Sequence, residues 1–175
     1  MGYTHYYPSN VKCSLADWEQ ILADLRRVID QAGIPLGNAD GEGLPSIGGN
    51  EICFNGADRD SHEAFQLVHT PYGMDEACKT ARKPYDAIVC CALMIVRHYV
   101  PKFEVLSDGD AEDWEDAVAL CRRVLHYGVY PCAGAVDTPD AVVKAVHGPT
   151  TVQPVDEVIE IHRTVITELG GGIPK

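Results

Sequence analysis

The stretch PYDAIVCCALMIVRHYV, residues 84–100, decides the fold, because it contains the longest apolar run of the chain, residues 87–96. The run is too short to span a bilayer. Apolar side chains around most of a helix are typical of a buried helix. Pro84 suits the first helical position, where its missing N–H costs nothing, and Asp86 suits the first turn by its charge. We therefore predict a core helix over residues 84–100.

Strands and two more helices are predicted around this segment. Residues 2–8, 51–56, 64–70 and 102–108 are rich in β-forming residues or alternate apolar with polar ones. We expect 51–56 and 64–70 to pair as antiparallel strands. Residues 14–33 and 110–128 have helical apolar spacing, with a capping box at Ser14 and Asp17, a stop at Gly33 and Asp110 as a cap. The predicted fold class is α+β, a small antiparallel sheet with two or three helices packed on one face.

The C-terminal part of the chain differs from the rest, because it predicts helices without strands. Residues 138–148 and 154–172 both have helical patterns. We divide the chain into an α+β core domain, residues 1–132, which carries the expected anion or nucleotide site, and a C-terminal helical extension, residues 133–175. The extension either enlarges the domain or mediates self-association, so a homo-oligomer is one expected state.

Composition excludes several classes of partner. The 175 residues include 26 acidic and 14 basic side chains, for a net charge of −12. Such a chain repels nucleic acid polymers and anionic membrane surfaces, although a local cluster of cations can still bind a small anion. The seven cysteines form no CxxC pair, and no signal peptide precedes them. We expect a reduced, cytoplasmic protein without a membrane segment, a metal site or a cofactor.

Three cations stand close together in ACKTARKPYDA, residues 77–87: Lys79, Arg82 and Lys83. They precede the predicted core helix, whose N-terminal N–H groups and dipole attract anions. Arginine binds phosphate or carboxylate bidentately, and lysine binds it as a point charge. The segment therefore predicts an anion clamp. The alternative is that these cations pair with surface carboxylates.

Two further segments supply candidate side chains. Strand alternation in THYY puts Thr4 and Tyr6 on one face and His5 and Tyr7 on the other. Asp108 follows Ser107 at the end of a predicted strand, where loops commonly carry function. Asp108 could bind ribose hydroxyl groups, act as a base or form part of a capping turn.

The elements GYTHY, CKTARKPYD and SDGDAEDWEDA together resemble a family of small bacterial and phage proteins without a settled activity. The resemblance covers roughly residues 2–128. It implies that one site is formed by residues from all three elements, namely Thr4, His5, Tyr6, Lys79, Thr80, Arg82, Lys83, Tyr85, Asp86, Ser107 and Asp108. By analogy, small phage proteins with compact ligand pockets often counter bacterial immunity by sequestering nucleotide messengers.

Three functions are compatible with these observations. The first is binding, without turnover, of a small phosphorylated ligand such as a nucleotide-derived immune signal, with Tyr6 and Tyr85 against its non-phosphate part. The glycine-rich loop 33–50 could close over it.

The second is a nucleotide hydrolase or transferase, with His5 or His62 as acid–base and Asp108 or Glu63 beside it. The third is a protein-interaction module. Because P-loop, GxGxxG and GxSxG signatures are absent, the sequence favours binding over turnover.

Overall fold

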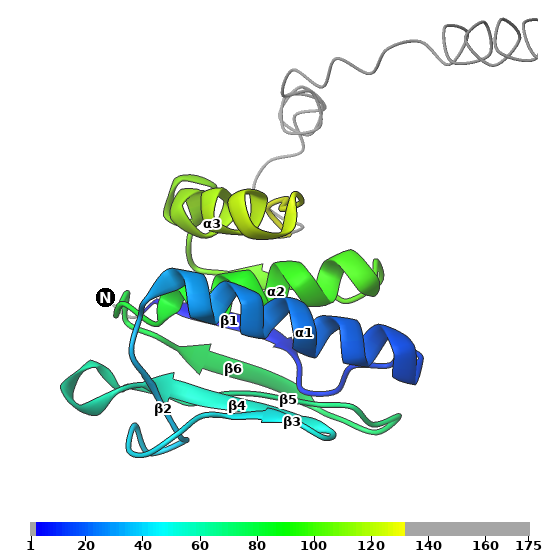
Figure 1. The fold of residues 1–175 in the computed structure, drawn as a ribbon, viewed down its shortest axis with the longest axis horizontal. Helices are drawn as coiled ribbons and strands as arrows, with labels where there is room; N and C mark the ends of the chain where they lie inside the picture. The colour runs from blue at the N-terminus through cyan, green and yellow to red at the C-terminus, as the bar shows by residue number, and fades with distance from the viewer. Residues whose placement is uncertain (1–2, 132–175) are drawn as a thin grey trace, which may run out of the picture. The chain divides into compact units, whose positions relative to one another are not determined.

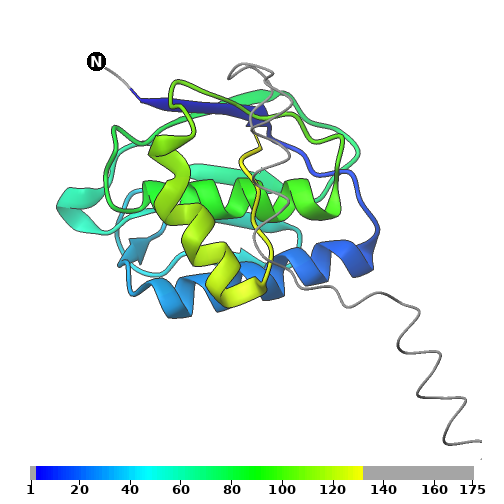
Figure 2. The same cartoon turned by 90° about the horizontal axis from the view of Figure 1, so that it is seen from above.

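Helix α2 (Asp86–Tyr99) forms the centre of the fold in a computed structural model, which describes residues 3–131. The nine residues 88–96 are all buried, which confirms the predicted core helix. Helices α1 (Leu15–Ala32) and α3 (Glu115–Leu125) pack against α2 and against each other (Figure 1). Figure 2 shows β1 and α1 on opposite sides of α2, so the helix is covered from several directions.

A three-stranded antiparallel sheet carries the first predicted strand in its middle. Strand β1 (Thr4–Pro8) lies between β6 (Asp75–Lys79) and β7 (Leu106–Ser107). The burial of β1 alternates, with His5 and Tyr7 inward and Tyr6 outward, as strand geometry predicted. Strand β6 was missed in the sequence, where residues 77–79 were assigned to a turn. Strand β7 is shorter than the predicted strand 102–108, because only Leu106 and Ser107 pair with β1, although Phe103 and Val105 are buried as alternation predicts.

A four-stranded antiparallel sheet is built on β4 (Glu51–Gly56). It pairs with β5 (Phe65–Val68), with β3 (Ser46–Gly48) and with β2 (Leu36–Gly37). The predicted pairing of 51–56 with 64–70 is therefore confirmed. The segment 33–50, which the sequence indicated as a glycine-rich loop, contains the two short strands β2 and β3. A short 3-10 helix, η1 (Asp58–Asp60), follows β4.

The structure also tests the predicted fold class and the predicted start of the core helix. The α+β class holds: three helices accompany antiparallel sheets in the described residues. Helix α2 begins at Asp86 with Tyr85 as its N-cap, so Pro84 lies in the preceding turn rather than at the first helical position. The helices predicted over 138–148 and 154–172 lie outside the described residues. No helix within residues 3–131 is long and apolar enough to cross a membrane.

Candidate functional site

The predicted site residues lie on both faces of the β1 sheet. Cross-strand pairing sets Thr4 opposite Lys79, and Tyr6, which is 43% exposed, opposite Leu106 on the outer face. His5 is fully buried on the inner face. Side chains directly opposite each other share a face of a sheet. The sheet therefore separates Thr4, Lys79 and Tyr6 on its outer face from His5 on its inner face.

Inward of β1 lies a buried polar cluster, here called the His5 cluster, formed by His5, Thr80, Asp86 and Cys90. Nε2 of His5 lies 2.9 Å from Oδ1 of Asp86, and the Thr80 hydroxyl donates a hydrogen bond to the same oxygen. Sγ of Cys90 lies 3.8 Å from Nε2 of His5 and 4.0 Å from Oδ2 of Asp86. Asp86 and Cys90 are one turn apart on α2 and so share a face of that helix.

Aromatic rings enclose the imidazole of His5. Tyr3 and Trp114 contact it with perpendicular rings, at centroid distances of 5.1 and 5.2 Å. Nδ1 of His5 and Nε1 of Trp114 have no hydrogen-bond partner among the described residues. Burial, followed by the nearby Cys90 and Asp86, raises the pKa of Tyr3 above its usual range. The side chain of Asp86, 14% exposed, gives the His5 cluster its contact with solvent.

The basic turn, residues 79–83, joins β6 to α2 and has unusual backbone geometry. Ala81 and Arg82 have φ values of 51° and 55°, in the left-handed region that non-glycine residues rarely adopt. The N–H of Lys83 donates to the Thr80 carbonyl at 3.0 Å, and the N–H groups of Thr80 and Ala81 donate to the Tyr3 carbonyl at 3.1 and 3.3 Å. These hydrogen bonds hold a tight turn that its sequence does not favour.

The three cations of the basic turn have different surroundings. Arg82 forms a bidentate ion pair with Asp113, at 3.0 to 3.2 Å, and its guanidinium lies 4.2 Å from the centre of the Tyr3 ring. Nζ of Lys83 donates to the Arg59 carbonyl at 2.5 Å. The backbone N–H of Lys79 donates to a carboxylate oxygen of Glu63 at 2.7 Å. The expected pairing with surface carboxylates is therefore present for Arg82.

Buried Asn55 holds two loops beside the basic turn. Its Nδ2 donates to the carbonyls of Ala39 and His62 at 3.0 and 3.2 Å, and its Oδ1 accepts from the N–H groups of Gly56 and His62. The glycine-rich loop and the β4–β5 connection thus meet. Lys83 then joins that connection to the basic turn. Figure 1 shows the start of β1, the β4–β5 connection and the start of α2 at one end of the molecule.

The other predicted site residues take mainly structural positions. Tyr85 is fully buried, and its hydroxyl donates to the Glu63 carbonyl at 2.8 Å, so its ring is not available to a ligand. Oγ of Ser107 accepts from the N–H of Gly109 at 3.0 Å. Asp108 is exposed, and its N–H donates to the Thr4 carbonyl at 3.0 Å.

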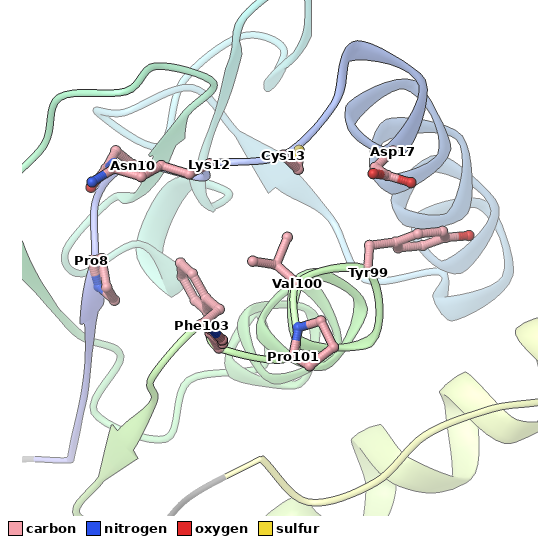
Figure 3. A pocket seen from close by; sticks show the side chains of 10 residues that line it. Pro8, Asn10, Lys12, Cys13, Asp17, Tyr99, Val100, Pro101 and Phe103 are labelled. Carbon is pink, nitrogen blue, oxygen red and sulfur yellow. The ribbon is translucent and has the colours of Figure 1, made fainter.

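Two large hollows of the described residues lie away from the basic turn, and two smaller ones do as well. One, of about 610 Å³, lies between the chain after β1, the start of α1 and the end of α2, and is lined by Pro8, Asn10, Lys12, Cys13, Asp17, Tyr99, Val100, Pro101, Lys102 and Phe103 (Figure 3). The other, of about 1050 Å³, is lined partly by Tyr6 and Leu106 on the outer face of the β1 sheet. Tyr6 therefore belongs to a different surface from Arg82 and Lys83.

Sequence reasoning missed four residues of this region: Tyr3, Cys90, Asp113 and Trp114. Cys90 was not singled out as a site residue in the sequence, although its spacing of four from Asp86 was a signal that both share a face. No family model, curated protein or solved structure matches the chain, so the resemblance to a bacterial and phage family stays a prediction.

Proposed function

We propose that the protein binds a small phosphorylated ligand at the basic turn and does not convert it. The observation that carries the proposal is the strained turn itself: two successive left-handed residues, Ala81 and Arg82, between Lys79 and Lys83. Strained backbone of this kind persists where the surroundings hold it, and it is concentrated at ligand clamps and active sites.

Local charge supports an anionic ligand. The hydrogen bond from Nζ of Lys83 to the Arg59 carbonyl brings the β4–β5 connection to the turn. Four of the chain's 14 lysine and arginine residues thus lie in or next to the basic turn, namely Arg59, Lys79, Arg82 and Lys83. Carboxylates lie there too, since Asp58 and Asp60 flank Arg59, Glu63 accepts from the N–H of Lys79 and Asp113 pairs with Arg82. Because the guanidinium of Arg82 is already paired with Asp113, the ammonium groups of Lys79 and Lys83 would be the main contacts to phosphate.

Burial of His5, one of the two candidate acid–base residues, supports binding over turnover, whereas the other, His62, is exposed. His5 is fully buried, and its Nε2 contacts Asp86 rather than the surface. A general acid or base must lie within hydrogen-bond reach of the proton that it transfers. A ligand held by Lys79 and Lys83 on the outside of the turn is separated from that imidazole by the turn itself. A nucleotide derivative, including a signalling nucleotide, is the ligand class that we propose.

The test uses ligand retention followed by affinity measurement. The full chain is incubated with nucleoside mono-, di- and triphosphates, cyclic dinucleotides and ADP-ribose, then filtered and heat-denatured, and the released compounds are analysed by mass spectrometry. We expect one compound to be retained and released intact. Recovery of a converted product would contradict binding without turnover, and an absence of retention across the panel would contradict the proposal.

Matched variants then test whether the retained compound binds at the basic turn. Removal of both ammonium groups, Lys79→Ala with Lys83→Ala, should weaken binding of the retained compound at least about tenfold, because each charge-assisted contact contributes about 1.5–3 kcal/mol. The control is Lys102→Ala, an exposed lysine beyond the opposite end of α2. Equal affinities in the double variant and the control would place the ligand elsewhere.

A further inference from the structure

We propose that His5, Asp86 and Cys90 bind one divalent zinc-type metal ion beneath the basic turn. One ligand atom from each of these side chains lies within 4.8 Å of the other two. The three residues come from β1 and from successive turns of α2, so the fold brings them together from positions far apart in the sequence. The proposal does not depend on the phosphorylated ligand proposed above.

The interatomic distances are near those of a tetrahedral zinc centre. With zinc bonds of about 2.0 Å to nitrogen and oxygen and about 2.3 Å to sulfur, tetrahedral geometry separates nitrogen from oxygen by about 3.3 Å and either from sulfur by about 3.5 Å. Nε2 of His5 lies 2.9 Å from Oδ1 of Asp86. Sγ of Cys90 lies 3.8 and 4.0 Å from the histidine nitrogen and from Oδ2 of Asp86. The two Asp86 distances involve different oxygens of its carboxylate, but one ligand atom from each residue lies within 4.8 Å of the other two. Small side-chain movements would therefore bring the ligands to the distances that zinc requires.

The donor set also balances the charge of the ion. Imidazole, thiolate and carboxylate are all zinc ligands, whereas a thiolate is a poor ligand for magnesium or calcium. One thiolate and one carboxylate neutralise a divalent cation, which lowers the cost of burying it. On binding, Cys90 releases its thiol proton to solvent, and Nε2 of His5 must carry no proton to bind the ion. Three protein ligands leave the fourth tetrahedral position for water.

Surrounding residues would fix these ligands in place. The Thr80 hydroxyl donates to Asp86 and orients its carboxylate. Tyr3 and Trp114 contact the His5 ring with perpendicular planes, and an N–H on Nδ1 can make a weak hydrogen bond to an aromatic face. In the absence of metal, the same atoms form a hydrogen-bonded network between β1, the basic turn and α2. The two states therefore need little rearrangement.

The experiment compares two adjacent buried thiols of α2. The full chain is stripped with a chelator, reloaded with zinc and analysed for bound metal by mass spectrometry, in parallel with Cys90→Ala and Cys91→Ala. Cys91 is equally buried, but its Sγ donates to the Ala117 carbonyl at 3.5 Å, away from the His5 cluster. We expect about one zinc ion per chain in the wild type and in Cys91→Ala. In Cys90→Ala we expect affinity to fall by more than about a hundredfold, since even loss of an outer-shell partner costs 10–100-fold.

A second readout does not need the variants to fold. Cobalt added to the stripped wild-type protein should give a thiolate-to-metal charge-transfer band and the intense visible bands of a tetrahedral site. An octahedral cobalt spectrum without a thiolate band would overturn the proposal, as would zinc binding that is equal in Cys90→Ala and Cys91→Ala. Circular dichroism of both variants distinguishes loss of the metal ligand from loss of the fold.

Discussion

The replacement Ala81→Gly should make the protein more stable, although it removes a methyl group and adds freedom to the unfolded chain. Ala81 is exposed and has a φ of 51°. The left-handed conformation costs a residue with a Cβ atom about 1–2 kcal/mol, and glycine avoids that cost. Glycine in the unfolded chain has more conformational freedom, which offsets about 0.5–1 kcal/mol. The expected net gain in the free energy of unfolding is about 0.5–1 kcal/mol.

The same replacement at a second alanine, Ala119→Gly, should lower the free energy of unfolding. Ala119 is also exposed but lies within α3, where its backbone is helical. Glycine at such a position is less stable than alanine by about 1 kcal/mol. The two variants should therefore differ by about 1.5–2 kcal/mol, although the chemical change is identical.

Urea unfolding followed by tryptophan fluorescence measures both variants. Trp18 and Trp114 are fully buried, so unfolding of residues 3–131 changes the environment of both rings. If Ala81→Gly lowers the free energy of unfolding as much as Ala119→Gly does, the turn is not strained. The left-handed backbone at Ala81 and Arg82 would then not indicate a ligand clamp. If the strain positions the cations, Ala81→Gly should bind the phosphorylated ligand more weakly while it unfolds at higher urea.

Two further predictions concern the buried tyrosines. Gly109→Ala should destabilise the protein by about 1–3 kcal/mol in urea unfolding, because a Cβ atom there would lie 2.3 Å from Oη of Tyr3, and an unchanged midpoint would contradict this packing. Burial raises the pKa of Tyr7 and Tyr127 above the usual 10. The unfolded chain therefore loses phenolic protons first, so stability should be full below pH 10 and fall as the pH rises above it. Tyrosinate absorbance recorded with circular dichroism tests this, and titration of all tyrosines near pH 10 in an intact fold would refute it.

Local patterns predicted most of the fold. Apolar spacing identified α1 and α3, and a continuous apolar run identified α2. β-Forming residues identified β1, and alternation identified β4 and β5, because each of these signals depends on neighbours within a few residues. Strand β6 was missed for a physical reason. Its residues 75–77 are exposed, and Cys78 is its one buried residue, so it lacks the alternation that marks a half-buried strand. Backbone pairing with β1, rather than its own side chains, makes it a strand.

The site was harder to predict, because its contacts join distant parts of the chain. His5 and Asp86 are 81 residues apart, and no local pattern couples them. The sequence did single out both residues, together with Thr80, but it placed them with Thr4 and Tyr6 in one site. Strand alternation already argued against that grouping, since it sends His5 and Tyr6 to opposite faces of β1. The structure follows the alternation.

The basic turn is the element that both proposals share. Lys79 and Lys83 would contact the phosphorylated ligand, while Thr80 between them donates to Asp86, a proposed metal ligand. A ligand that shifts the turn would therefore change the geometry of the His5 cluster, and a metal ion that fixes Asp86 would fix the turn. Coupling of this kind is reciprocal by thermodynamic necessity. If both sites exist, zinc must change the affinity for the phosphorylated ligand by the same factor by which that ligand changes the affinity for zinc.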